Sequence, residues 1–151
     1  MRESRQWSKL DNAAKIFPPT SGRRDTKVFR FSCELYEQVD PELLQSALDR
    51  TLTQFPLYKS ILKKGLFWYY FETSALRPVV REEDSPPCGP MYSADRKNLL
   101  FEVTYFQRRI NLEVYHALAD GTGALHFLRT LVFYYLCKKH GIPQSGAAID
   151  Y

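Results

Sequence analysis

The stretch that decides the fold is INLEVYHALADGTGALHFLRTLVFYYLCKK, residues 110–139. Its first part, Ile110–Tyr115, alternates apolar and polar side chains, which predicts a half-buried strand. Its last part, Thr122–Lys139, repeats apolar residues at helical spacing, which predicts a long helix. Between them lies an H-x-x-x-D-G sequence, His116–Gly121, which connects the predicted strand to the predicted helix.

The three named positions of this connection have distinct chemical uses. His116 continues the strand alternation, so its side chain is expected on the buried side of the sheet, and an imidazole can act as a general base near neutral pH. Asp120 is suited both to brace the loop that aims the histidine and to cap the following helix. Gly121 indicates either a close backbone approach or only a tight turn.

The segments around this stretch predict an α+β fold, with helices packed on a mixed, mostly antiparallel sheet. Residues 27–37 alternate like a strand, and Asp40-Pro41-Glu42 opens a helix that Pro56 closes. Residues 81–98 are rich in proline, glycine and charge, which predicts a long surface loop. Further strands are expected at residues 58–62, 66–72 and 99–106, the last pairing with 110–115 as a hairpin.

The composition excludes several classes of partner. The 21 Lys and Arg exceed the 17 Asp and Glu by four, but they occur as scattered pairs, so nucleic-acid binding is not expected. Three cysteines without a C-x-x-C pair predict neither a disulfide framework nor a zinc site, and fit a cytoplasmic protein. No apolar run is long enough to span a membrane, and the first 17 residues lack the apolar core of a signal peptide.

The strand, the H-x-x-x-D-G sequence and the apolar helix together resemble the active-site segment of the chloramphenicol-acetyltransferase-like superfamily. This superfamily includes CoA-dependent acyltransferases, alcohol acetyltransferases and the condensation domains of peptide synthetases. Two further stretches, LDNAAKIFP at residues 10–18 and GLFWYYFE at residues 65–72, resemble bacterial proteins described as alcohol acetyltransferases. The resemblance implies a fold of two subdomains, with a channel between them where acyl donor and acceptor meet at the motif histidine.

The resemblance covers the N-terminal half of that fold alone. Residues 1–143 are therefore expected to form an N-terminal acyltransferase-like subdomain. Residues 144–151 are expected to be a tail, or the start of a linker to a missing C-terminal half.

The resemblance implies transfer of an acyl group from acyl-CoA, as co-substrate, to a small-molecule alcohol or amine. His116 is the expected general base, and direct attack without a covalent intermediate is favoured because no Ser or Cys pairs with it in the motif. Asp120, which in the family often pairs with an arginine, and Gly121 are expected to support the site. Tyr115 stands where condensation domains usually carry a second histidine, which favours the acyl-CoA branch. Tyr115 is a substrate-channel candidate, or it simply ends the strand. No metal and no permanently bound cofactor are expected.

Two alternatives stay open. The chain is also consistent with a non-catalytic half-domain that acts as a binding or assembly module, forming a homo-oligomer or pairing with a C-terminal half; His116 would then be a core histidine. The aromatic run Leu66–Phe71 either lines an acyl pocket or, as its composition favours, forms a strand buried on both faces.

Overall fold

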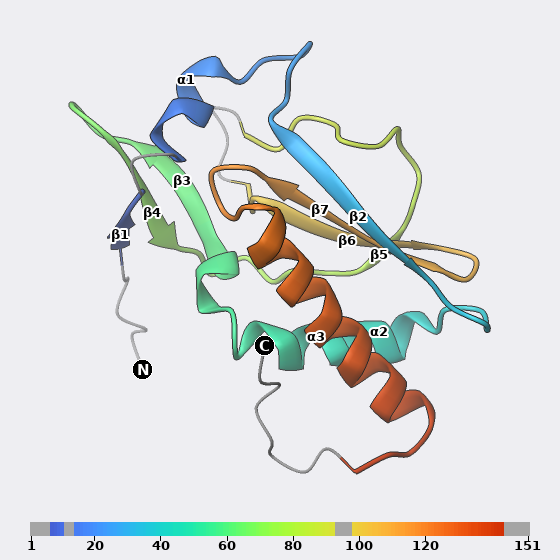
Figure 1. Cartoon of the computed structure of the whole chain (residues 1–151). Helices are drawn as coiled ribbons and strands as arrows, with labels where there is room; N and C mark the ends of the chain where they lie inside the picture. Colours follow the sequence, from blue (N-terminus) through green and yellow to red (C-terminus); the bar gives the residue numbers. More distant parts are fainter. Residues whose placement is uncertain (1–6, 11–13, 93–97, 144–151) are drawn as a thin grey trace.

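The structure, a computed structural model, describes residues 7–10, 14–92 and 98–143 (Figure 1). Within these residues two sheets and two long helices enclose one apolar core. The predicted tail at residues 144–151 lies outside the described residues.

The larger sheet has four strands in the order β2-β7-β6-β5. They are β2 (Val28–Glu34), β7 (Arg109–Tyr115), β6 (Phe101–Phe106) and β5 (Arg81–Glu82). β5 runs parallel to β6, whereas the β2–β7 and β6–β7 pairs are antiparallel. The prediction of a mixed, mostly antiparallel sheet in an α+β fold is confirmed.

A smaller antiparallel sheet stands apart from the first, in the order β1-β4-β3. Its strands are β1 (Trp7–Lys9), β4 (Tyr69–Thr73) and β3 (Ser60–Lys64). The sequence predicted the β3 and β4 regions as strands but did not separate them from the main sheet. Figure 1 shows the β3–β4 hairpin projecting away from the larger sheet.

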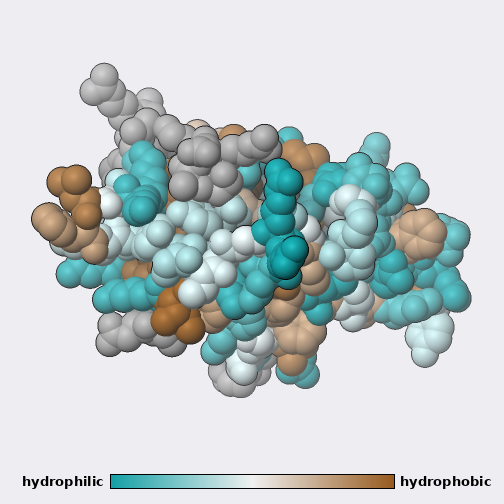
Figure 2. Space-filling model, turned by 90° about the horizontal axis from the view of Figure 1, so that it is seen from above, coloured by the Kyte–Doolittle hydropathy of each residue, from teal (hydrophilic) through white to brown (hydrophobic). Residues whose placement is uncertain are grey.

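The prediction that Leu66–Phe71 forms a strand buried on both faces is wrong. The backbone N–H of Gly65 donates to the carbonyl of Trp68 at 2.7 Å, and this hydrogen bond closes a turn instead of extending the strand. Leu66 and Phe67 are therefore 95% and 87% exposed at the hairpin tip. Figure 2 shows apolar side chains projecting at one end of the molecule.

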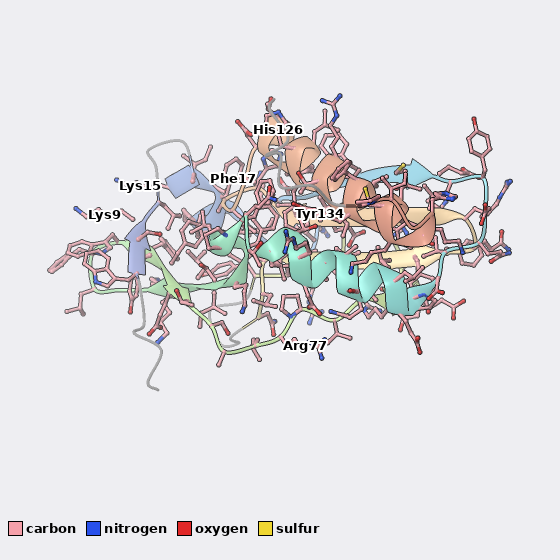
Figure 3. The ribbon with its side chains drawn as sticks, turned by 90° about the horizontal axis from the view of Figure 1, so that it is seen from below. Lys9, Lys15, Phe17, Arg77, His126 and Tyr134 are labelled. Carbon is pink, nitrogen blue, oxygen red and sulfur yellow. The ribbon has the colours of Figure 1, made fainter. Side chains whose placement is uncertain are left out.

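Two helices, α2 (Pro41–Leu52) and α3 (Gly121–Lys139), pack side by side on one face of the larger sheet (Figure 3). The Asp40 carboxylate caps α2 by accepting hydrogen bonds from the backbone N–H groups of Glu42 and Leu43, at 3.0 and 3.3 Å. α3 begins one residue earlier than its apolar periodicity predicts. The two helices bury their apolar faces against Ile110, Leu112 and Val114.

Three short helical segments complete the described chain: η1 (Ala14–Ile16), α1 (Phe17–Thr20) and η2 (Pro56–Lys59). The sequence analysis predicted none of them, because turns this short have little helical periodicity of their own. α1 lies above the connection between β7 and α3 in Figure 1.

The sheet face opposite the helices is polar and is covered by the segment that follows β5. Glu83 forms ion pairs at 2.7 Å with both Arg30 and Arg109. The backbone N–H of Cys88 donates to Glu113 at 2.7 Å. The predicted surface loop is therefore fastened to the sheet along its described part, and it begins with the short strand β5. Residues 93–97 of that prediction lie outside the described residues.

Candidate functional site

The connection between β7 and α3 holds the H-x-x-x-D-G sequence at the end of the central strand. The backbone N–H of His116 donates to the carbonyl of Lys27 at 2.8 Å, so this residue still belongs to the β2–β7 ladder. The chain then turns, and the N–H of Leu118 donates to the carbonyl of Tyr115 at 2.9 Å. His116 therefore has a backbone position fixed by the sheet, although its side chain lies past the last strand residue.

Two aromatic rings contact the imidazole of His116. The ring of Phe17 in α1 is stacked on it, with centroids 5.0 Å apart and planes 14° apart. The ring of Phe29 in β2 lies 4.4 Å away, tilted by 44°. Phe29 pairs with Val114 across the ladder, so His116 lies on the helix-facing side of the sheet, as the alternation predicts.

The nitrogen atoms of this imidazole are not used by the described part of the chain. The described residues contact the His116 side chain through aromatic rings, and none of them forms a hydrogen bond with it. The side chain is only partly buried. Because a neutral imidazole carries one acceptor nitrogen, the arrangement leaves a base available to a ligand proton.

Asp120 is the N-cap of α3. Its carboxylate accepts a hydrogen bond from the backbone N–H of Gly123 at 2.7 Å, and its carbonyl accepts from Ala124 at 3.0 Å. The capping role predicted for it is confirmed. The arginine partner that the family resemblance implies is not found among the described residues.

Gly121, the first residue of α3, has ordinary helical backbone angles, not left-handed ones. A methyl group added there would meet Phe31 at 3.9 Å, an ordinary van der Waals distance. Neither the turn nor packing among the described residues therefore requires a glycine. A close approach by a substrate stays a prediction.

Lys27 has a left-handed backbone, with φ of 56°, directly opposite the histidine. Its side chain pairs with Asp25 at 2.5 Å. A non-glycine residue in this region costs about 1–2 kcal/mol, and such strained positions cluster at functional sites. The sequence gives no signal for this feature.

Tyr115, the substrate-channel candidate, is fully buried on the other face of β7. Its hydroxyl lies 2.6 Å from the Ser21 hydroxyl and its ring stacks on Tyr92 at 5.6 Å. Burial raises the pKa of Tyr115 to about 12, the hydrogen bond with Ser21 opposes the rise, and the neighbouring Tyr92 and Tyr69 add to it. The structure thus places Tyr115 against other side chains and not on an open surface.

Tyr58 is a residue that the sequence analysis missed. Its ring stacks on Phe127 of α3 at 4.2 Å, and its side chain is 4% exposed. Its hydroxyl has no hydrogen-bond partner among the residues that the structure describes. Burial, and then the charge of Asp120, raise the pKa of Tyr58 well above its ordinary value, so the hydroxyl stays protonated. Nothing in the sequence around Tyr58 distinguishes it from an ordinary core tyrosine.

Two hollows in the surface lie away from His116. One, of about 360 Å³, lies beside the β5–β6 edge, and the other, of about 340 Å³, lies between β2 and the last turns of α3. Within the described ranges no three His, Cys, Asp or Glu side chains form a metal-holding group. In the same ranges no helix has the length and apolar character needed to cross a membrane.

No protein-family model matches the sequence, and no curated protein matches it. Solved structures do match. A mutant of the starter condensation domain of the rhizomide synthetase RzmA superimposes with a TM-score of 0.73 and 11% identity, over 94% of this chain and 40% of that one. Polyketide synthase associated protein 5 from Mycobacterium tuberculosis matches with a TM-score of 0.64 and 15% identity, over 95% of this chain and 36% of that one. The first condensation domain of the calcium-dependent antibiotic synthetase gives 0.63 and 18%, over 90% and 39%.

These comparisons show the fold. The chain has the architecture of part of a condensation domain, so the resemblance inferred from the H-x-x-x-D-G segment is confirmed at the level of the fold. The chain spans about two fifths of the length of these structures. At identities of 11–18% the similarity shows the fold alone and assigns no role to any residue.

Proposed function

We propose that this chain is the N-terminal half of a CoA-dependent acyltransferase, which moves an acyl group from a thioester to an alcohol or amine. The observation that carries the proposal is the imidazole of His116, to which no described residue forms a hydrogen bond, on a backbone fixed at the end of the central strand in an acyl-transfer-related fold. A general base in that position removes the proton from the acceptor as it attacks the thioester carbonyl, an effect worth about 10²–10⁴-fold in rate.

Direct attack is the mechanism that the site favours. The described residues place no serine or cysteine side chain in hydrogen-bond contact with His116. Burial raises the pKa of the Cys33 and Cys88 thiols, which makes both of them poor thiolate nucleophiles. The acceptor oxygen or nitrogen then bonds to the acyl carbon, the C–S bond breaks, and CoA leaves as the thiol.

The proposed channel needs a second wall. His116 lies partly exposed just after the end of β7, and neither hollow described above includes it. We propose that a C-terminal half, in the same polypeptide or in a partner chain, covers this end and supplies much of the CoA site. Gly121 has room for a small side chain, which would meet Phe31 at an ordinary van der Waals distance of 3.9 Å, so a close approach by such a half is one reason for a glycine there.

A second candidate function rests on a different observation. The β3–β4 tip exposes Leu66, Phe67 and Trp68 together, and such a contiguous apolar group is typical of an interaction surface. A non-catalytic half-domain that binds a partner or a second copy would use it. This alternative requires no chemistry at His116.

The experiment is thiol release from acetyl-CoA with a panel of alcohols and amines. It compares the complete polypeptide that contains these 151 residues with its His116→Ala form, and includes the 151-residue chain by itself. The proposal expects acceptor-dependent thiol release that His116→Ala reduces at least 10²-fold while the fold is retained. His126→Ala is the matched control, because His126 lies on α3 itself, and it is expected to keep activity.

Unchanged thiol release in His116→Ala would overturn the role of the histidine. Absence of acceptor-dependent thiol release from the complete polypeptide would overturn the acyl-CoA proposal. Concentration-dependent association of the chain, abolished by serine substitutions at the hairpin tip, would then favour the binding module. Acyl transfer from a thioester on a carrier protein, but not from CoA, would correct the donor and keep the base.

A further inference from the structure

We infer that Phe17 is a positioning residue for His116, and that the segment Phe17–Ser21 sets the plane of the imidazole. The inference rests on the proposed function, because it concerns how the proposed base is aimed. It is carried by the stacked contact at 5.0 Å and by the hydrogen bonds that the Ser21 hydroxyl forms with Phe17 and Tyr115.

A base histidine commonly owes its orientation to a hydrogen bond on its second ring nitrogen. In the described part of this chain no such bond is made by His116, so the ring plane has to be fixed by packing. Phe29 is tilted by 44°, whereas Phe17 lies within 14° of parallel. The near-parallel ring of Phe17 therefore restricts rotation of the imidazole out of its plane, and leaves the ring edge with its nitrogens open.

The position of Phe17 is restricted by the two prolines that follow it and by a hydrogen bond to its carbonyl. It is followed by Pro18 and Pro19, whose rings fix the backbone φ angle and so limit the freedom of α1. The Ser21 hydroxyl donates to the Phe17 carbonyl at 2.5 Å. Phe17 is the first residue of α1 and is labelled in Figure 3.

The same segment is fastened to the residue beside the histidine. The Ser21 hydroxyl, which donates to the Phe17 carbonyl, also lies 2.6 Å from the Tyr115 hydroxyl, within hydrogen-bond distance. Consecutive residues of a strand point to opposite faces. The segment Phe17–Ser21 thus contacts the end of β7 from both sides, through Tyr115 on one face and His116 on the other.

The first test reads the histidine without any activity assay. In the isolated chain labelled with ¹³C-histidine, the ring signals of His116, assigned by their loss in His116→Ala, are expected to show the ring-current shift of a stacked phenyl group. Phe17→Leu should move these signals towards those of an exposed histidine, and Phe17→Tyr should keep them. Phe31→Leu is the matched control, because Phe31 contacts Phe29 at 5.7 Å, one ring removed from the histidine. Signals that do not move in Phe17→Leu would overturn the inference.

A second variant covers the case in which Phe17→Leu fails to fold. Ser21→Ala removes the anchor to Tyr115 but keeps the phenyl ring, and is expected to broaden or split the His116 signals. Unaffected His116 signals in that variant would refute the anchoring by Ser21.

The third readout separates this inference from the proposed function. In the complete polypeptide, Phe17→Leu is expected to lower kcat about 10- to 100-fold with little change in KM. Misplacing a reacting group by about an ångström can lower the rate about 100-fold. Phe17→Tyr should restore the rate. A rise in KM with unchanged kcat would refute positioning. If the NMR signals respond while no variant releases thiol, the stacking stands and the acyl-transfer proposal fails.

Discussion

The carboxylate of Asp120 accepts a hydrogen bond from the backbone N–H of Gly123 at 2.7 Å, which ties the last residue of the β7–α3 connection to the first turn of α3. Asp120→Ala removes this cap and is expected to lower the free energy of unfolding by about 0.5–2 kcal/mol. Asp120→Asn keeps an accepting oxygen and should cost much less. Urea unfolding of the three proteins measures both effects.

The comparison of the two variants identifies what Asp120 does. If Asn is as destabilising as Ala, the negative charge of Asp120 at the positive end of the α3 dipole matters more than the hydrogen bond to Gly123. If both variants unfold like the wild type, the cap does not contribute to stability.

Tyr58 carries a buried hydroxyl to which none of the described residues forms a hydrogen bond, so removing that oxygen is expected to stabilise the protein. An unpaired buried polar group costs about 1–3 kcal/mol, and Tyr58→Phe should raise the free energy of unfolding by about 1 kcal/mol. Tyr115→Phe is the matched control. It loses a formed hydrogen bond with Ser21 and should lower stability by about 0.5–1.5 kcal/mol. Thermal unfolding followed by circular dichroism measures both. A destabilised Tyr58→Phe would mean that the hydroxyl has a partner.

Gln107 occupies the first position of the two-residue turn between β6 and β7, with a left-handed φ of 54°. Turns of this kind prefer glycine at that position. Gln107→Gly is expected to stabilise the protein by about 0.5–1 kcal/mol, because it relieves the strained backbone. Arg108→Gly, at the next position, has no such strain to relieve and should destabilise. Equal effects of the two substitutions in urea unfolding would contradict this interpretation.

The sequence predicted best those elements whose pattern is long and regular. The alternation of Ile110–Tyr115 and the helical spacing of Thr122–Lys139 locate β7 and α3 to within one residue, since burial of one face determines both. Leu66–Phe71 was misread because an aromatic run has the same composition in a buried strand and in an exposed turn. The turn depends on the Gly65–Trp68 hydrogen bond, which composition does not reveal.

The site was predicted only where it is contiguous in sequence. His116 and Asp120 lie in one motif, and the capping spacing of Asp120 can be read directly. Phe17 and Tyr58 reach the site from elements far away in the chain, and their contacts exist only after the sheets and helices pack. No pattern in the sequence around Phe17 or Tyr58 connects either residue to the motif.

The hairpin tip is expected to be unimportant for folding but important for association. Leu66→Ser with Phe67→Ser removes two side chains that are almost fully exposed, so the free energy of unfolding should change by less than about 0.5 kcal/mol. Self-association of the chain should fall, because a contiguous apolar group leaves the surface. Sedimentation velocity over a range of concentrations measures it.

The tip substitutions are compared with Phe71→Ser, because Phe71 lies in the same hairpin but is only 4% exposed. It should destabilise the chain strongly, because it leaves a cavity and a buried hydroxyl in the core. A large loss of stability from the tip substitutions themselves would show that Leu66 or Phe67 packs in solution.

Glu83 makes the stability of the polar sheet face depend on pH. The hydrogen bond from Arg30 and, after it, that from Arg109 hold the pKa of Glu83 below its ordinary value of 4.5, although burial opposes them. Because the pKa is lower in the folded than in the unfolded protein, the stabilisation is complete above the unfolded value. It is lost as the pH falls from about 4.5 through the folded value. Glu83→Gln should therefore have a lower Tm than the wild type at pH 7, and the difference should shrink towards pH 3.

The neighbouring Glu82 provides the control, since it is exposed and makes no ion pair with the described residues. Glu82→Gln should follow the wild-type Tm at every pH. In Glu83→Gln the Arg30 guanidinium keeps its 2.9 Å ion pair with Glu113, whereas Arg109 loses the carboxylate that pairs with it at 2.7 Å. The Tm difference between Arg109→Gln and the wild type should accordingly shrink towards pH 3 as well, but it should be smaller than the difference for Glu83→Gln. A Tm difference between Glu83→Gln and the wild type that stays constant from pH 7 to pH 3 would mean that Glu83 acts through packing and not through its charge.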